Sequence, residues 1–295
     1  MTMFGLSKTV VAAVLATGLA TSGYAQTVET KQYDDGGVYE GTFLDGKQHG
    51  TGTYRLPNGY EYTGEWIEGE IRGQGVATFP NGSVYEGTFL AGKPEGQGRI
   101  TFADGGTFEG DWLDGNITGQ GIAVYANGVT YEGEFRNAMH NGTGTMTSPG
   151  GYIYEGSWIN GAKEGDGKIT YPDGAIYEGN LKSGTRDGVG TLTMADGLIY
   201  SGDWVDGEIQ GAGTLTQPNG DVYVGTLVDG RREGEGTATY ANGDTYSGTF
   251  LADLRHGTGT FTGTDGYLYS GEWFDGQIAG NGEVTYPDGS VYVGT

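Results

Sequence analysis

Six glutamates recur at multiples of 23 residues and are the first candidates for acid–base chemistry: Glu40, Glu86, Glu109, Glu132, Glu155 and Glu178. Two carboxylates act as general acid and general base only when their surroundings separate their pKa values. The same residue repeated at even spacing gives every carboxylate the same surroundings, with no pocket to separate a pair. No nucleophile, base and oxyanion donor cluster within one repeat either. We therefore expect that the protein is not an enzyme.

Histidines and a second line of acids are the candidate metal ligands. His49, His140 and His256 fall in the same loop of three different repeats, so they cannot converge on one zinc ion. Oxygen ligands that could gather calcium form a periodic line: Asp45, Glu68, Asp114, Asp206, Asp229 and Asp275. The nonapeptide motif of calcium-binding β-rolls is missing, and acidic residues also serve solubility. We expect no cofactor and no resident metal, with calcium as an open alternative partner.

Aromatic rings are the remaining candidates for a site. Tyrosine or phenylalanine opens each repeat, and tryptophan, phenylalanine or leucine follows four residues later, with all five tryptophans in that column. Such rings could form the core of the sheet, or they could stack on a ligand or partner. The interaction face predicted from these columns comprises Tyr62, Trp66, Tyr85, Phe89, Phe108, Trp112, Tyr131, Phe135, Tyr154, Trp158, Tyr200, Trp204, Tyr246, Phe250, Tyr269 and Trp273.

The element that must position these residues is a strict 23-residue repeat. The tripeptide Tyr39-Glu40-Gly41 returns at 23-residue intervals as far as Tyr292-Val293-Gly294, without insertion or deletion. Below, positions in a unit are counted from its opening aromatic residue as position 0. Units this short cannot bury a core alone and must stack on their neighbours. We expect eleven full units and a C-terminal stub over residues 38–295, after a polar and loose lead-in at 26–37.

Within each unit, side chains alternate with the period of a β-strand. Tyr62, Gly64 and Trp66 share one face, and after a turn Gly75 and Ala77 return to it. We expect a first strand from about position −1 to +5 and a second from about +12 to +17. Turns such as Pro80-Asn81-Gly82 are expected to reverse the chain tightly, while the loop around positions +6 to +11 is expected to be longer and variable. The fold class predicted is all-β, an elongated single-layer antiparallel sheet of tandem hairpins.

Composition and the N-terminal segment bear on location and partners. The chain carries a formal net charge of −23 and no cysteine, which excludes disulfides and disfavours nucleic acid and anionic membranes as partners. Residues 1–25 combine Lys8, the apolar run 10–19 and small residues before Ala25, the pattern of a cleaved signal peptide. The alternative, a membrane anchor, needs a longer apolar span. We expect export to the periplasm or the extracellular space.

One unit reads Tyr85-Glu86-Gly87-x-Phe89, continues with Gly92, Gly96 and Gly98, and is joined to its neighbours by turns such as Pro80-Asn81-Gly82. This pattern resembles the MORN (membrane occupation and recognition nexus) repeat. Some units also place histidine before glycine as that family does, as in His49-Gly50 and His256-Gly257. The resemblance covers about residues 38–295 and is to an exported protein of bacterial type. It implies an elongated, twisted hairpin ladder that serves as a scaffold, often self-associating and sometimes credited with phospholipid binding. It implies no shared enzyme activity.

The function expected from these observations is a non-catalytic scaffold that binds a protein partner or a second copy of itself through the aromatic groove and the variable loop rim. The alternative is a ligand-binding module, in which a glycan, lipid or apolar ligand lies along the tryptophan and tyrosine columns. The identity of the partner, the oligomeric state and any ligand specificity are not determined by the sequence.

Overall fold

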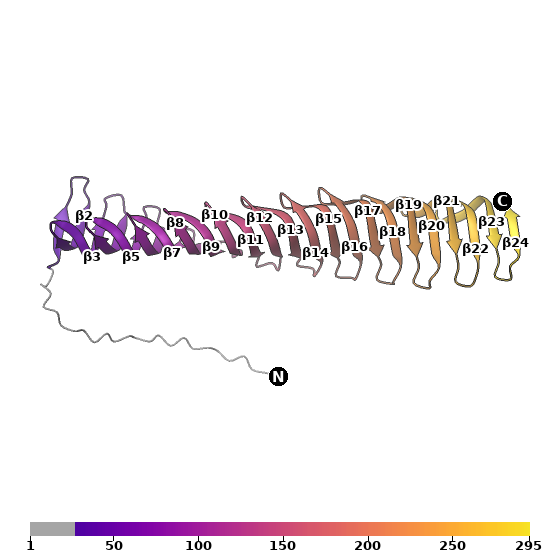
Figure 1. Ribbon diagram of the computed structural model, residues 1–295, viewed down its shortest axis with the longest axis horizontal. Coiled ribbons are helices and arrows are strands. Elements are labelled where there is room, and N and C mark those ends of the chain that lie inside the picture. The colour runs from indigo at the N-terminus through magenta and orange to yellow at the C-terminus, as the bar shows by residue number, and fades with distance from the viewer. Residues whose placement is uncertain (1–26) are drawn as a thin grey trace, which may run out of the picture.

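The computed structural model describes residues 27–295 as one sheet of 24 strands. Figure 1 shows the strands following one another in chain order along the long axis of the molecule. Each strand pairs antiparallel with its neighbours in sequence, as in the pairing of β4 with β3 and β5. Residues 27–295 contain no helix. The elongated single-layer antiparallel sheet predicted from the period is therefore confirmed.

Strands of seven and nine residues alternate between the two short strands at the ends of the sheet. The bounds are β1 Glu29–Gln32, β2 Val38–Leu44, β3 Lys47–Arg55, β4 Glu61–Ile67, β5 Glu70–Thr78, β6 Val84–Leu90, β7 Lys93–Thr101, β8 Thr107–Leu113, β9 Asn116–Val124, β10 Thr130–Arg136, β11 Met139–Thr147, β12 Ile153–Ile159, β13 Ala162–Thr170, β14 Ile176–Lys182, β15 Thr185–Thr193, β16 Ile199–Val205, β17 Glu208–Thr216, β18 Val222–Val228, β19 Arg231–Thr239, β20 Thr245–Leu251, β21 Leu254–Thr262, β22 Leu268–Phe274, β23 Gln277–Thr285 and β24 Val291–Gly294.

The two connections are the reverse of what the sequence suggested. The segment predicted as a longer variable loop holds a two-residue turn, for example Glu68-Gly69 with φ of 52° and 91°. Both residues have positive φ, as a type I′ turn requires, and that turn suits the twist of a hairpin. The second strand therefore begins at position +8, four residues earlier than predicted. The first residues of this strand were predicted to form a loop because their charged side chains obscure the alternation of apolar and polar residues.

The Pro-Asn-Gly connection is the longer of the two. In the turn between β5 and β6, the Phe79 N–H donates to the Ser83 carbonyl at 2.8 Å and the Gly82 N–H donates to the Phe79 carbonyl at 2.9 Å. Only Gly82 has positive φ, at 87°, while the Asn81 side chain accepts from the Ser83 N–H at 3.0 Å. Asparagine is thus used for its side-chain acceptor and not for a left-handed backbone.

A β-bulge interrupts the second strand of the units and explains the acids at position +3. The register of β8 with β9 shifts between Gly110 and Trp112, which frees backbone N–H groups from the ladder. Asp111 accepts the N–H of Gln120 at 2.7 Å, and Asp203 accepts that of Ala212 at 3.0 Å. These carboxylates therefore accept hydrogen bonds from backbone N–H groups that the bulge leaves without a partner in the ladder.

The core consists of tyrosine rings that lie flat across glycines. Tyr62 is completely buried, and its hydroxyl donates to the Glu65 carbonyl at 3.0 Å. A Cβ atom on Gly64 or Gly75 would stand 2.3 or 2.4 Å from atoms of this ring, closer than real Cβ contacts allow. Glycine at positions +2 and +13 is therefore what lets the ring lie flat.

The tryptophans join successive units. The indole Nε1 of Trp66 donates to the carbonyl of Gly52 in the preceding hairpin at 3.3 Å. The ring also lies edge-to-face between Tyr39 and Tyr62, with centroids 5.1 and 5.7 Å away. Aromatic pairs in this geometry contribute about 0.5–1.5 kcal/mol each beyond their buried area. The core is thus one continuous apolar row, in which Leu181 and Leu227 replace the ring at position +4 of two units, and not a set of separate cores.

The N-terminal end of the described chain corrects one expectation. Glu29–Gln32 forms β1 and pairs antiparallel with β2, with Gln32 opposite Val38. The lead-in 26–37 was predicted to be loose, and for these four residues that prediction was wrong, because the open edge of β2 offers them a ladder of backbone partners. The predicted signal peptide, residues 1–25, lies outside the described residues.

Candidate functional site: the two faces of the sheet

The aromatic face is packed shut. All sixteen aromatic residues predicted as an interaction face are buried, with exposed fractions of at most 7%. Their ring faces and edges contact one another and the glycines beneath. Outside the cavity beside Phe108, a ligand or partner cannot stack on these rings without displacing their neighbours, so contact there is made with the side chains that cover them.

Cationic side chains cover part of this face, at position +9. The guanidinium of Arg186 lies 4.1 Å from the Trp204 ring and that of Arg255 lies 4.2 Å from the Trp273 ring. Arg186 also donates to the carbonyl of Gly207 at 2.8 Å. The predictions from sequence missed this column because it mixes isoleucine, cations and other residues and lies in the segment predicted to be a loop. The arginines Arg186, Arg232 and Arg255 each bind one hairpin to the next.

His140 occupies the same column and is held between aromatic rings. Its imidazole stacks on Tyr131 with centroids 3.7 Å apart, and its Nε2 lies 2.7 Å from the Tyr125 hydroxyl. Burial lowers the pKa of His140 to about 4, because the charged form loses water. The tyrosines respond in the opposite direction: burial raises the pKa of Tyr131 to about 12.

The predicted metal candidates occupy turns and separate hairpins. His49, His140 and His256 lie on β3, β11 and β21. The acids at position +6 occupy the first place of the two-residue turns, where Asp45 and Asp114 have φ of 50° and 51°. Aspartate tolerates this left-handed backbone, which explains its recurrence without a bound ion. Across residues 27–295, no three His, Cys, Asp or Glu side chains gather closely enough to hold a metal ion.

The glutamate column at position +1 lies on the opposite, solvated face. Glu178 pairs with Lys168 at 2.9 Å, and its side chain is 61% exposed. Glu40 lies 3.7 Å from Arg55 and is similarly exposed. Such exposed pairs contribute little to stability.

That polar face carries an apolar line, here called the outer stripe, at position +5. Nine of its eleven members are large apolar side chains that are 43 to 61% exposed: Leu44, Ile67, Leu90, Leu113, Ile159, Val205, Val228, Leu251 and Phe274. The other two members are Arg136 and Lys182. The stripe runs beside the two-residue turns along the array. It was missed from the sequence, although counting residues at position +5 would have found it.

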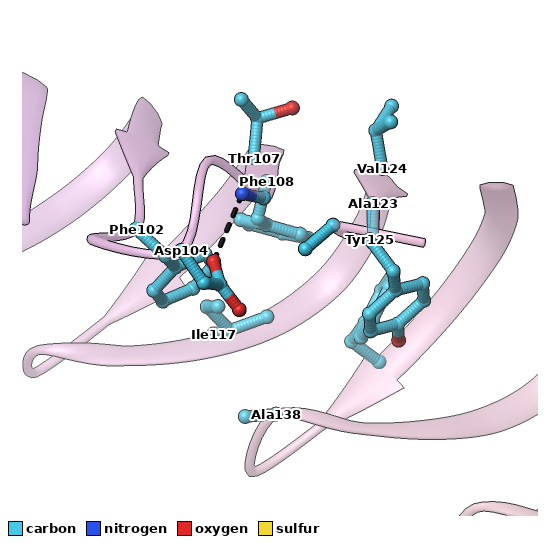
Figure 2. Close-up of a pocket in the computed structure, with 12 residues that line it drawn as sticks. Phe102, Asp104, Thr107, Phe108, Ile117, Ala123, Val124, Tyr125 and Ala138 are labelled. Carbon is cyan, nitrogen blue, oxygen red and sulfur yellow. Dashed lines mark hydrogen bonds between the residues drawn. The ribbon is translucent and has the colours of Figure 1, made fainter. Parts of the chain in front are cut away.

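A cavity interrupts the packing of the aromatic face beside Phe108, and the preceding unit has a larger hollow at the equivalent place, lined by Ser83, Ile100 and Trp112. The cavity beside Phe108 has a volume of about 120 Å³. Figure 2 shows Phe102 and Asp104 on one side of it, Tyr125 on the other, and Ile117 between them. Phe108 and Ile117 are buried, whereas Phe102 and Tyr125 are 38% and 42% exposed. The cavity therefore has a buried apolar floor and an aromatic rim.

Comparison with known proteins identifies the family to which the repeats are similar. The family model described as "MORN repeat" matches eleven times, at residues 39–59, 62–84, 85–107, 108–130, 131–151, 154–176, 177–199, 200–222, 223–245, 246–266 and 269–291. Alsin of Rattus norvegicus is 43% identical over 58 residues, and Alsin of Homo sapiens is 40% identical over 58 residues. Each match covers 18% of this chain and 4% of Alsin.

Among solved structures, the TCP10 domain of Danio rerio CPAP in complex with a STIL peptide is 16% identical, with a TM-score of 0.32 over 91% of this chain and 99% of that one. The TCP10c domain of Drosophila melanogaster Sas-4 is 16% identical, with a TM-score of 0.33 over 52% and 93%. Within residues 27–295, no helix has the length and apolar character needed to cross a membrane. The repeat matches, in register with the hairpins of the sheet, show that the chain belongs to the MORN repeat family.

Proposed function

We propose that the protein is a non-catalytic scaffold that associates through its outer stripe, with a second copy of the chain as the first occupant. The observation that carries this proposal is the exposure of nine large apolar side chains in one column. Contiguous apolar surface on a monomer beyond a few hundred Å² marks an interaction site. The buried aromatic residues act as the core that keeps the members of this stripe evenly spaced.

A second copy is favoured by the period of the stripe. Two strand spacings of about 4.8 Å separate successive stripe residues by about 9.6 Å. An unrelated partner would have to reproduce this spacing over the whole array, whereas another copy of the chain carries it already. A two-fold arrangement would bring the same stripe of both copies together.

Charge opposes this association and makes it testable. The net charge of −23 repels a second copy at low ionic strength, and salt screens that repulsion. Apolar contact between like-charged copies should therefore strengthen as salt is added. Association through salt bridges would weaken instead.

The experiment measures mass by light scattering across protein and salt concentrations. Leu113→Asp with Ile159→Asp alters two stripe residues. Ile122→Asp with Val224→Asp alters two residues that are similarly exposed, at 47% and 54%, but lie off the stripe. We expect the wild type and the off-stripe variant to dimerise, and the stripe variant to remain monomeric. A wild type that is monomeric at all concentrations, or equal behaviour of both variants, would contradict the proposal.

We also propose that the scaffold is exported. The support is the charged, then apolar, then small-residue pattern of residues 1–25, which is typical of a cleaved leader. Mass spectrometry of the protein recovered outside the cytoplasm should give a chain beginning at Gln26. Recovery of the uncut chain from the cytoplasm would contradict export.

A further inference from the structure

We propose that the cavity beside Phe108 is a binding site for a small monocyclic aromatic molecule without negative charge. This inference is independent of the outer stripe, which lies on the other face of the sheet. It depends on the volume of the cavity, the small residues that line it, the character of its walls and the charge at its rim.

The volume fits one ring. The cavity measures about 120 Å³, and an engineered apolar cavity of roughly 150 Å³ in another protein stays dry and binds benzene. Phe108, Ile117 and Phe135 are at most 8% exposed and form apolar walls. Aromatic walls favour an aromatic guest, because rings attract one another edge-to-face.

Two small residues of one unit line the cavity, at positions −2 and +15. Several other units combine a small residue with a large one at these positions. In the first unit, for example, the place of a Gly37 side chain is taken by the Tyr54 ring, whose hydroxyl would lie 2.2 Å from a Cβ on that glycine. The unit of Phe108 places Gly106 and Ala123 at these positions, the smallest pair among the eleven units. Hollows also occur at the equivalent place in the units of Tyr85 and Tyr246, so the small pair sets the size and lining of this cavity and not its occurrence.

The rim is ordered. The Tyr125 hydroxyl lies 2.7 Å from His140 Nε2, and that ring is stacked on Tyr131. Ala138 lines the opposite edge (Figure 2) in a left-handed backbone with φ of 60°. At this place in the turn, nine of the eleven units have glycine, which adopts that backbone without strain. The methyl group of Ala138 therefore lies beside the cavity, although alanine disfavours the left-handed backbone that places it there.

The charge at the rim selects among aromatic molecules. Asp104 lines the cavity, and one of its carboxylate oxygens accepts the N–H of Gly106 at 2.9 Å. No basic residue lines the cavity. An anionic substituent on the guest would face this carboxylate, whereas a hydroxyl or ammonium group could donate to it. Benzyl alcohol and benzylamine are therefore suitable probes, and benzoate is the unfavourable one.

The test uses ligand-observed NMR saturation transfer and the thermal midpoint. Ala123→Ile narrows the cavity with a residue that the fold already accepts at this position, because Ile100 and Ile169 occupy it in other units. Ala238→Ile makes the same change at position +15 of another unit and serves as the matched control. Circular dichroism and the midpoint without probe establish that both variants fold.

We expect benzyl alcohol and benzylamine to bind the wild type and Ala238→Ile equally, and to bind Ala123→Ile at least tenfold more weakly. Benzoate should bind the wild type at least tenfold more weakly than benzyl alcohol. The proposal is overturned if no probe binds the wild type in millimolar excess, if Ala123→Ile binds as well as the wild type, or if benzoate binds as well as benzyl alcohol.

Discussion

The Tyr62 ring lies so close over Gly75 that a Cβ atom on this glycine would stand 2.4 Å from the ring's Cε2 atom. Gly75 does not have positive φ, so the ring alone requires glycine here. We therefore predict that Gly75→Ala lowers the free energy of unfolding by about 1–3 kcal/mol through overpacking. Gly150→Ala, at a glycine with open space around it and no positive φ, is the control and should be close to neutral.

These two variants are compared by chemical denaturation followed by tryptophan fluorescence. Long repeat arrays can lose two-state behaviour, so the midpoints are compared together with the slopes. Equal midpoints for Gly75→Ala and Gly150→Ala would show that the ring can move aside and that glycine is not needed beneath it.

The buried tyrosines predict loss of stability in alkali. Burial raises the pKa of Tyr85, like that of Tyr131, to about 12, from an ordinary value of 10. Between these values the unfolded chain loses protons that the folded chain retains, so the stability present below pH 10 falls as the pH rises toward 12. Tyrosinate absorbance and circular dichroism should change together in this interval. Tyrosine ionisation near pH 10 with the sheet intact would contradict the prediction.

The destabilising effect of Tyr85→Phe should become smaller as the pH rises. At neutral pH this variant loses the bond from the Tyr85 hydroxyl to the Thr88 carbonyl and should be destabilised by about 0.5–1.5 kcal/mol. Above pH 10 it removes one group whose ionisation unfolds the chain, so its disadvantage should shrink. Phe108 shows that the array accepts phenylalanine at this position. A constant difference at all pH values would contradict the role of ionisation.

The low pKa of His140 predicts that the folded protein loses stability in acid. This folded-state pKa of about 4 lies below the ordinary 6.5, so the unfolded chain takes up a proton as the pH falls below 6.5 while the folded chain does not. The stability that His140 contributes above pH 6.5 is lost as the pH falls toward 4. His140→Gln should flatten this part of the stability profile. An unchanged slope in the variant would assign the acid sensitivity to other groups.

Adjacent arginines on β19 provide a matched test of the cationic column. Arg232 lies 5.3 Å from the Phe250 ring and donates to the Asp253 carbonyl at 2.6 Å, whereas Arg231 is exposed. We predict that Arg232→Met destabilises by about 1–2 kcal/mol and that Arg231→Met has little effect. Thermal midpoints measure both. Equal effects would mean that loss of charge, and not the bond between hairpins, determines stability.

The strained Ala138 predicts a stabilising substitution. Ala138→Gly should raise stability by about 0.5–1 kcal/mol, because glycine adopts the left-handed backbone freely. Gly115→Ala is the reverse change at the equivalent place, where φ is 83° and a Cβ would make only ordinary contacts, and it should lower stability by a similar amount. The two midpoints should shift in opposite directions. A shift in the same direction would show that packing at the rim outweighs the backbone.

The sequence by itself determined the hairpin period and the all-β single-layer fold, because alternation and glycine register are local properties repeated in every unit. Tertiary structure decided which turn is tight, since positive φ at Glu68-Gly69 depends on the twist of the paired strands. It also decided that the aromatic residues are core and the outer stripe is surface. The cavity at Gly106 and Ala123 depends on how side chains of neighbouring hairpins add up in volume, and only the folded sheet brings those side chains together.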